Sequence, residues 1–298
     1  MRKIHFQVTR ALDPKPAASF AEKNTREKMA RTIADRLAKE IRIRDISHLK
    51  SKHINLLVQS LKTSGPKGKP LRIGTMKNYL AQIRRMARGI GKPQIVHSKN
   101  SHYGIGKRTT CAEHSKAQRL TQVTAAQIKI EWVQLAARLA GEFGMRAEES
   151  LKFQVELATA KGNDHVYMLG SWCKNGRGRF MQIETQAQRQ LLEEIKQFTS
   201  KSWQQSMIPQ ELSYVQAQRK LRYELGKFGI KPHGLRHNWA QEKYRSMIGM
   251  EPPVCGGLKF NEMSREQRDL ASLAYQVISD HLGHSRKYVA SHYLGGRY

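Results

Sequence analysis

Apolar residues recur every three or four positions along most of this chain, which is the spacing expected of helices that bury one face. In the segment 74–88, GTMKNYLAQIRRMAR, five apolar residues share one face, and Thr75 is the expected N-cap. The same spacing predicts helices over residues 20–41, 47–62, 124–144, 186–199 and 213–228, a helical continuation over 145–153, and a long helix that opens at residue 231.

Two short stretches interrupt this helical pattern. Residues 165–172 (HVYMLGSW) and 179–184 (RFMQIE) have strand character, and the Gly-containing segment CKNGRG between them predicts a hairpin turn. We therefore expect a mainly α fold with a small antiparallel β-sheet, in the α+β class.

Length and loop composition divide the chain. The 298 residues are enough for two domains. Residues 89–111 are rich in Gly, Ser, His and Lys and lack apolar periodicity, which favours a linker. We expect a helical N-terminal DNA-binding domain over 1–92, a basic linker over 93–117 and a second domain over 118–298.

Charge points to the partner. The chain has 53 Lys and Arg against 24 Asp and Glu, a formal net charge of +29, and a pI near 10.3. A protein this basic usually binds a polyanion, and nucleic acid is the first candidate. An anionic membrane surface is the alternative, but no strongly apolar amphipathic face favours it. No apolar run has the length of a membrane span, so we expect no membrane partner.

The positive charge is concentrated in one region. Between Ile46 and Ala112 there is no Asp or Glu, against nine Lys and five Arg. We expect this region to follow a phosphate backbone. The candidate DNA contacts are Lys77, Arg84, Arg85, Arg88, Lys107 and Arg108.

The cysteines and the first residues favour an intracellular protein. Three widely spaced cysteines do not form a disulfide framework, which fits the reducing cytosol. The N-terminus, MRKIHFQVTRALDPKP, has no apolar core of a secretion signal. We expect a cytoplasmic, nucleoid-associated protein.

Two motifs that would imply a cofactor are incomplete. The segment GIGKRT lacks the first Gly of a phosphate-binding loop, and Arg108 stands where Ser or Thr would bind magnesium. The spacing of His97, His102, Cys111 and His114 does not match a zinc finger, so solvated loop residues are expected there. We expect no metal and no cofactor.

The C-terminal segment HLGHSRKYVASHYLGGRY, residues 281–298, raises the question of a reactive phenol, because it holds Tyr288, Tyr293 and Tyr298. A phenol is a poor nucleophile at its ordinary pKa of about 10. Attack on a phosphodiester would need cations on the phosphate, a base near the phenol and a cationic acid near the leaving oxygen. Arginine suits the phosphate because its planar fork stays charged.

The chain offers such groups at separate places. Arg146 follows the helix-breaking Gly144, and Lys174 stands at the expected hairpin tip. In HGLRH, His233 and Arg236 are three residues apart and share a helix face. His284 precedes a helix that Ser285 is expected to cap. Each of these residues alone is more often structural than catalytic.

Taken together and in order, these residues resemble the signature of the tyrosine recombinase (phage-type integrase) family. The resemblance covers about residues 20–298 and implies a helical core-binding domain followed by the tyrosine-recombinase catalytic domain. The matching residues are Arg146 with Glu149 (R-x-x-E), Lys174 (the hairpin lysine), His233 and Arg236 (H-x-L-R-H), His284 (L-G-H) and Tyr293, nine residues after His284.

The resemblance implies a covalent mechanism. Arg146 and Arg236 would hold the scissile phosphate while Tyr293 attacks it and forms a 3′-phosphotyrosine. Lys174 would protonate the leaving 5′ hydroxyl, and a 5′ hydroxyl of another strand would reverse the step. Neither ATP nor a metal is required, because the covalent link conserves the bond energy.

Two histidines and several partners complete what the resemblance implies. His233 would assist proton movement at the phenol, and His284 would hydrogen-bond the phosphate. The implied substrate is double-stranded DNA with inverted half-sites, bound by a homotetramer that is a monomer or weak oligomer when free. Accessory DNA-bending or directionality proteins are further expected partners. The implied role is integration or excision of a mobile element.

The choice of tyrosine rests on the interval usual in the family. That interval favours Tyr293, with Tyr288 as the reserve, and Tyr298 is the last residue. Helical spacing alone does not separate Tyr288 from Tyr293.

Two features depart from the family pattern. Residues 248–269 look inserted between H-x-L-R-H and L-G-H, and a surface loop, a subunit contact and a DNA contact are all open readings. Only five residues follow Tyr293, so the usual C-terminal subunit contact is not expected in that form, and an arm-site domain is not expected before residue 20.

Two other functions remain open. A type IB topoisomerase would share the nucleophile and the phosphate clamp but would relax DNA as a monomer. A basic DNA-binding protein that has lost catalysis would bind DNA without forming an adduct.

Overall fold

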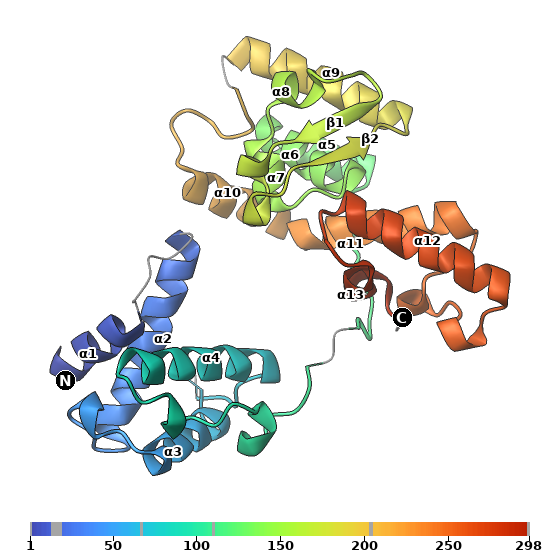
Figure 1. Cartoon of the computed structure of the whole chain (residues 1–298). Helices are drawn as coiled ribbons and strands as arrows, with labels where there is room; N and C mark the ends of the chain where they lie inside the picture. Colours follow the sequence, from blue (N-terminus) through green and yellow to red (C-terminus); the bar gives the residue numbers. More distant parts are fainter. Residues whose placement is uncertain (1, 13–19, 66–67, 109–110, 203–204, 297–298) are drawn as a thin grey trace. The chain divides into compact units, whose positions relative to one another are not determined.

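Two compact units, residues 1–109 and 110–298, make up the computed structural model. The structure describes the backbone of residues 2–12, 20–65, 68–108, 111–202 and 205–296 (Figure 1). Helices predominate and a single two-stranded sheet is described, so the predicted mainly α fold with a small antiparallel sheet is confirmed. No described helix is long and apolar enough to cross a membrane.

The N-terminal unit is a helical bundle around one apolar core. Its helices are α1 (Arg2–Leu12), α2 (Phe20–Lys39), α3 (Ser51–Thr63) and α4 (Ile73–Gly89), with short 3₁₀ turns η1 (Ile46–His48), η2 (Pro93–Ile95) and η3 (Asn100–Tyr103). The apolar face expected for 74–88 is buried in α4. The helix begins three residues earlier than expected, with Arg72 rather than Thr75 at the N-cap position.

The segment after α4 packs into this unit. Ile95, Val96, Tyr103 and Ile105 are buried in the same core as the four helices. The Tyr103 hydroxyl accepts a hydrogen bond from the backbone N–H of His97 at 2.8 Å. Much of the stretch expected to be a linker is therefore part of the N-terminal unit.

The second unit begins with a layer of helices around a large apolar core. These helices are α5 (Gln122–Gln127), α6 (Glu131–Glu142), α7 (Ala147–Lys152), α8 (Val155–Thr159), α9 (Gln186–Ser202) and α10 (Tyr214–Gly226). The single helix expected over 124–144 was wrong. This range is divided into α5 and α6, and Thr121 caps α5 through its side chain.

The small sheet is a hairpin of β1 (His165–Met168) and β2 (Arg179–Gln182). The strands are antiparallel, with Val166 opposite Met181. Both strands are shorter than expected, because the chain turns into the 3₁₀ segments η4 (Gly170–Trp172) and η5 (Lys174–Gly176) between them. Gly170 is required in this turn, since a Cβ there would lie 2.5 Å from the carbonyl oxygen of Gly176.

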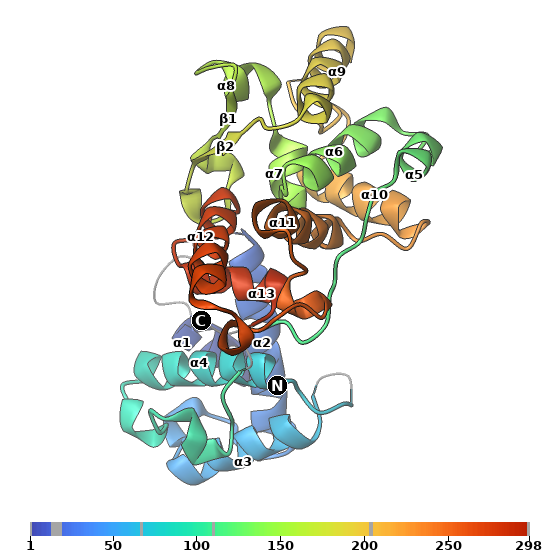
Figure 2. The same ribbon diagram turned by 90° about the vertical axis from the view of Figure 1, so that its right-hand side faces the viewer.

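The last part of the unit is built on α11 (Pro232–Ile248). This helix packs against α6 on one side and against α12 (Arg265–His281) and α13 (Ser291–Leu294) on another (Figure 2). A second apolar core, which includes Trp239, Tyr275 and Tyr293, joins these elements.

Tyr293 lies in a short helix. Residues 287–290 form the 3₁₀ turn η8 (Lys287–Ala290), and α13 follows with four residues. The expectation that Ser285 caps a longer helix was wrong, because Arg286 is the residue at the N-cap position of η8.

The stretch 248–269 forms two further 3₁₀ turns, η6 (Pro253–Cys255) and η7 (Phe260–Glu262), of which η6 contacts α13. A Cβ on Gly295 would lie 2.7 Å from the backbone nitrogen of Val254. This stretch therefore packs on the C-terminal segment of its own chain.

Candidate active site

Arg236 is the centre of the candidate site and is fully buried in α11. Its Nε donates to the hydroxyl of Tyr293 at 3.1 Å. Its two terminal nitrogens donate to the carbonyl oxygens of Gly144 at 2.6 Å and Leu282 at 2.5 Å. Burial lowers the pKa of Arg236 to about 10, so the group is still a cation at neutral pH.

Glu149 is the buried counter-ion of the site and has no exposed side-chain surface. It accepts from Arg146 at 2.6 Å and from Arg179 at 2.9 and 3.2 Å, and Arg236 lies 3.6 Å away. Burial by itself raises the pKa of Glu149, but the hydrogen bonds and charge of Arg179, with the charges of Arg236 and Arg146, outweigh it and lower the pKa to about 2. Three guanidinium groups therefore surround one carboxylate, which leaves the cluster cationic.

Arg146 is positioned by a turn that only glycine fits well. Gly144 has φ +62°, and a Cβ there would lie 2.8 Å from the ring of Trp239. His281 hydrogen-bonds the carbonyl oxygen of Phe143 at 3.0 Å and stacks on Trp239 at 4.0 Å. Together with the bond from Arg236, these contacts fix the turn that carries Arg146.

Arg179 belongs to the cluster and was missed by the sequence analysis. It is buried on β2, and its Nε donates to the carbonyl oxygen of His281 at 2.6 Å. One of its terminal nitrogens lies 3.2 Å from the sulfur of Cys173. Cys173 is the residue directly before Lys174 in the chain. Arg179 and Met181 are both buried, on the same face of β2. Side chains alternate between the two faces of a strand, so the sequence already placed Arg179 on the face of the apolar Met181. That position could have predicted a buried arginine.

Three histidines surround the phenol ring. His284 Nε2 lies 3.4 Å from the Tyr293 hydroxyl and 3.5 Å from Arg236. The rings of His233 and His237 lie 5.9 and 4.7 Å from the Tyr293 ring, and His237 was not among the predicted site residues.

All three rings are neutral near pH 7. Burial lowers the pKa of His284 to about 3 and that of His237 to about 4, and it also lowers the pKa of His233. Nearby arginines add to each shift. A neutral imidazole is able to accept a hydrogen bond or a proton from a neighbouring group.

Tyr293 is the tyrosine that meets this cluster. It is 5% exposed, and its hydroxyl contacts Arg236 and His284. Tyr288 is 44% exposed, and its hydroxyl accepts from Arg286. Tyr298 lies outside the described residues.

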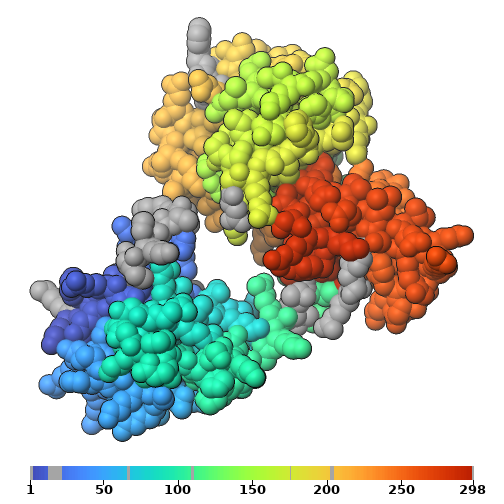
Figure 3. All heavy atoms as spheres, viewed as in Figure 1, coloured from blue at the N-terminus to red at the C-terminus, as the bar shows by residue number. Residues whose placement is uncertain are grey.

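Two cavities open beside the cluster, and Arg146 lines both. One has a volume of about 300 Å³ and is lined by Arg146, Lys174, Arg177, Gly283, His284, Ser285, Arg286, Tyr288 and Val289. The exposed Lys174 thus lies in the 174–176 turn and shares a cavity with Arg146 and His284. In the space-filling view, the yellow-green hairpin lies beside the red C-terminal segment (Figure 3).

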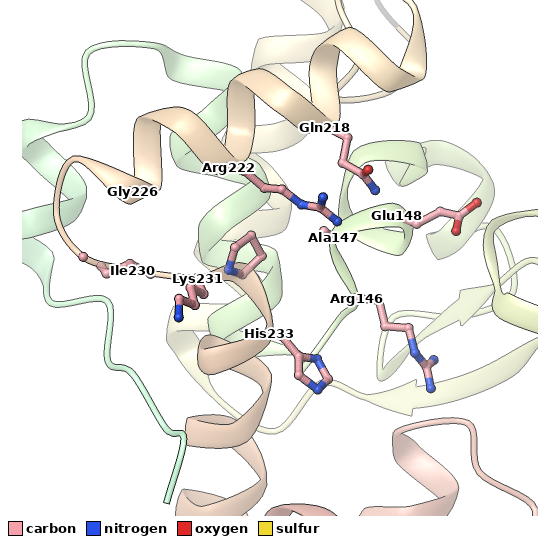
Figure 4. A pocket seen from close by; sticks show the side chains of 11 residues that line it. Arg146, Ala147, Glu148, Gln218, Arg222, Gly226, Ile230, Lys231 and His233 are labelled. Carbon is pink, nitrogen blue, oxygen red and sulfur yellow. The ribbon is translucent and has the colours of Figure 1, made fainter. Parts of the chain in front are cut away.

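The second cavity is larger, about 680 Å³, and lies between α7, α10 and α11. Arg146, Arg222 of α10 and His233 of α11 line it from separate elements (Figure 4). Lys231 lies at its edge. Arg222 and Lys231 were not predicted as site residues.

The six predicted DNA contacts lie in the N-terminal unit, and they differ in exposure and in the contacts they make within the protein. Arg84 donates to the carbonyl oxygen of His97 at 3.0 and 3.1 Å and to the side chain of Asn100 at 2.9 Å, so it holds the loop after α4. Arg88 is exposed and Arg85 is half-exposed on the same helix.

The other three candidates are also accessible. Lys77 of α4 is partly exposed, and Lys107 and Arg108 are exposed. The Arg108 side chain lies beside Gly74, where a Cβ would be 3.7 Å from it. Among the residues that the structure describes, no group of three or more His, Cys, Asp or Glu could hold a metal ion.

Comparison with known proteins gives a match to one family model and matches to several solved structures. Residues 1–96 match the model of the N-terminal domain of phage integrases. No curated protein sequence matches the chain. The matched structures include a lambda integrase dimer bound to a COC′ core site, the Tn1549 transposon integrase in complex with transposon right-end DNA, and the XerH site-specific recombinase bound to difH.

The structural similarity extends over nearly the whole chain. The lambda integrase match has a TM-score of 0.62 at 14% identity and covers 100% of this chain and 96% of the other. The Tn1549 match has a TM-score of 0.60 at 10% identity and covers 99% and 96%, and the XerH match has 0.55 at 15% and covers 93% and 76%. At such low identity these matches show a shared fold.

The Glu149 cluster generates a stability prediction. Glu149→Gln should lower the free energy of unfolding of the second unit by about 3 kcal/mol at pH 7, because the buried Arg179 and Arg236 and the partly exposed Arg146 lose their anion. The folded pKa of Glu149 lies near 2, below its ordinary 4.5, so its stabilisation is present above pH 4.5 and is lost as the pH falls toward 2. Urea unfolding of parent and variant between pH 7 and 2.5 measures both effects.

The matched control is Glu148→Gln. Glu148 pairs with Lys152 and is 42% exposed, so we expect a loss below about 1 kcal/mol. Equal stability of Glu149→Gln and the parent at pH 7 would contradict the assigned role of Glu149.

Proposed function

Because the chain has the tyrosine recombinase fold and a phage integrase N-terminal domain, we propose that it is a site-specific DNA recombinase that uses Tyr293 as its nucleophile. The observation that carries this proposal is the contact of the Tyr293 hydroxyl with a fully buried arginine, within a cluster of three guanidinium groups and one carboxylate. A cationic cluster of this kind attracts an anion, and it lies directly beside a phenol.

The proposed anion is the scissile phosphate. Arg146 is 24% exposed and lines both cavities, so it is able to bind a phosphate oxygen from solvent while Glu149 holds its position. Arg236 keeps its bonds to the two carbonyl oxygens, and its positive charge attracts the phosphate from its buried position. Fixed cations stabilise the negative charge that develops on phosphorus oxygens in the transition state, and they do so strongly where water is excluded.

The proposed chemistry transfers a phosphoryl group from one oxygen to another. The Tyr293 oxygen loses its proton and forms a bond to phosphorus, and the bond from phosphorus to the 5′ oxygen breaks. His233 and His284 are neutral and close enough to assist departure of the phenol proton. Arg236 donates a hydrogen bond to the Tyr293 oxygen at 3.1 Å and so fixes the position of the attacking atom.

Lys174 is the proposed acid for the leaving oxygen. It is a cation at the rim of the cavity that Arg146 and His284 share. Its position in an exposed hairpin turn gives the long side chain the reach to follow a 5′ oxygen. A 5′ hydroxyl from another strand then bonds to phosphorus, the bond from phosphorus to the Tyr293 oxygen breaks, and the phenol takes back its proton. One phosphodiester is exchanged for another, so no external energy source is required.

The proposed substrate is duplex DNA. The larger cavity carries Arg146, Arg222 and Lys231 along its walls, which suits a phosphate backbone that approaches the scissile position. The exposed basic residues of α4 and residues 107–108 are the proposed contacts of the N-terminal unit. We further propose inverted half-sites bound by four protomers, and a role in integration or excision of a mobile element.

A type IB topoisomerase would use the same nucleophile and clamp. The phage integrase match of residues 1–96 favours a recombinase. The test uses a supercoiled plasmid that carries no recombination site and a protein concentration at which the protein is a monomer. Relaxation of this plasmid would instead support the topoisomerase.

Tyr293→Phe should bind DNA as the parent does but form no covalent complex, because the variant lacks the attacking oxygen. The measurement is a denaturing gel of protein mixed with nicked suicide substrates that carry candidate sites. Tyr288→Phe is the matched control and should retain the adduct. A covalent adduct formed by Tyr293→Phe would show that another residue is the nucleophile. If the parent forms no adduct, a DNA-binding protein without catalysis is favoured.

Lys174→Met should slow cleavage of an ordinary phosphodiester by about 10²- to 10⁴-fold, since the 5′ oxygen then leaves without its proton. A substrate with sulfur at the 5′ bridging position should restore a rate near that of the parent, because a thiolate leaves without a proton donor. Arg177→Met, in the same cavity, serves as the control and should not respond to sulfur. An equal defect of Lys174→Met on both substrates would remove Lys174 from the acid role.

Neutralising Arg85 and Arg88 together should weaken DNA binding and reduce the slope of log affinity against log salt by up to about 2. Arg84→Gln should instead lower the unfolding temperature of the N-terminal unit, because Arg84 holds residues 97–100. Fluorescence anisotropy at several salt concentrations measures the slope. An unchanged slope would mean that this face of α4 does not contact DNA.

A further inference from the structure

The nucleophile segment, residues 291–296, is too short to satisfy its own backbone. A helix leaves its last carbonyl groups without partners inside the helix, and α13 has four residues. Within the segment, the carbonyl oxygen of Ser291 accepts a bond from the N–H of Gly295 at 3.0 Å. The other carbonyl bonds described for this segment come from groups elsewhere in the unit.

The first source is the segment 111–115, where the chain enters the second unit. The backbone N–H of Ala112 donates to the carbonyl oxygen of Ser291 at 3.0 Å. The Cys111 thiol donates to the carbonyl oxygen of Gly296. The entry segment thus runs along the nucleophile segment and contacts it on both sides of Tyr293.

The second source is Gln241, which is 1% exposed on α11. Its amide nitrogen donates to the carbonyl oxygen of Tyr293 at 3.1 Å and to the Ser115 hydroxyl at 3.0 Å. Its amide oxygen accepts from the Cys255 thiol at 3.2 Å. One buried amide therefore joins the nucleophile to the entry segment and to the stretch 248–269.

A third source fixes the end of the segment. The hydroxyl of the buried Tyr275 donates to the carbonyl oxygen of Gly295 at 2.5 Å. Gly295 and Gly296 have φ of +73° and +71° and lie against Val254 and Pro253 of the stretch 248–269.

From these contacts we infer that Gln241 is a positioning residue for Tyr293 and that the entry segment 111–115 shares this task. The inference rests on the proposed function of Tyr293. An in-line attack needs the phenol oxygen aligned behind the phosphorus, and an error of about 1 Å in such alignment costs up to about 100-fold in rate. The entry segment is bonded to the backbone that carries the nucleophile. Displacement of residues 111–115 would therefore move that backbone.

The test compares full-length Gln241→Met with the parent. Methionine has a similar length but no amide, so it breaks the bonds to Tyr293 and Ser115 while filling the space. We expect single-turnover cleavage to slow by about 10- to 100-fold at saturating protein, with DNA affinity unchanged. The sulfur-bridged substrate should not restore the rate, because the defect lies in the nucleophile and not in the leaving group.

A second readout does not depend on catalysis. Hydrogen exchange of the peptide 290–296 in the free protein should be faster in Gln241→Met than in the parent. Gln276→Met is the matched control, because Gln276 bonds Asp280 on α12 and does not touch Tyr293. It should leave both the exchange and the cleavage rate at the level of the parent.

Ala112→Pro tests the entry segment independently. Proline has no N–H, so the variant removes the bond to Ser291 without altering Gln241. It should slow cleavage and speed the exchange of 290–296 in the same direction as Gln241→Met. If Gln241→Met does not fold, Ser115→Ala replaces it as the milder variant.

The outcomes separate this inference from the proposed function. A parent without an adduct, but with protection of 290–296 that is lost in Gln241→Met, would overturn the recombinase and support the anchoring. An adduct-forming parent whose Gln241→Met variant cleaves and exchanges like the parent would overturn the positioning role and leave the proposed function standing.

Discussion

The candidate site depends on an arginine that stays charged while it is completely removed from water. Burying a guanidinium group is costly unless its hydrogen bonds are replaced. Arg236 meets this requirement with two carbonyl oxygens, a phenol and the nearby carboxylate of Glu149. The turn at Gly144, the end of α12 and Tyr293 are therefore held in one place because each supplies an acceptor to the same cation.

The same constraint explains the state of the histidines. Burial and the neighbouring arginines keep His233, His237 and His284 neutral. In the proposed reaction a bound phosphate partly offsets the positive charge around them and raises their affinity for a proton. The site would thus accept the phenol proton most readily when the substrate is present.

Much of the fold and the outline of the site were predictable from the sequence, because they depend on local patterns. The buried face of α4, the hairpin and the helix that carries His233 and Arg236 follow from periodicity and turn residues. Of the residues that the resemblance selected, Arg236, His233 and His284 lie beside Tyr293. The packing of residues 95–105 on the N-terminal core was not predictable in this way, because four scattered apolar side chains have no helical period.

Residues that act through buried polar contacts were missed for a related reason. Arg179, His237 and Gln241 are recognised by what they touch, and their partners lie far away in the sequence. The stretch 248–269 was predicted to be an insertion, and its contact with the C-terminal segment was not predictable because it depends on tertiary packing.

Peptide mapping of the DNA-linked residue tests the central claim most directly. The parent protein is trapped on a suicide substrate, digested, and analysed by mass spectrometry for the peptide that carries the nucleotide. We predict that the nucleotide is found on Tyr293, the tyrosine whose hydroxyl Arg236 contacts. A nucleotide on Tyr288 or on any other residue would contradict it.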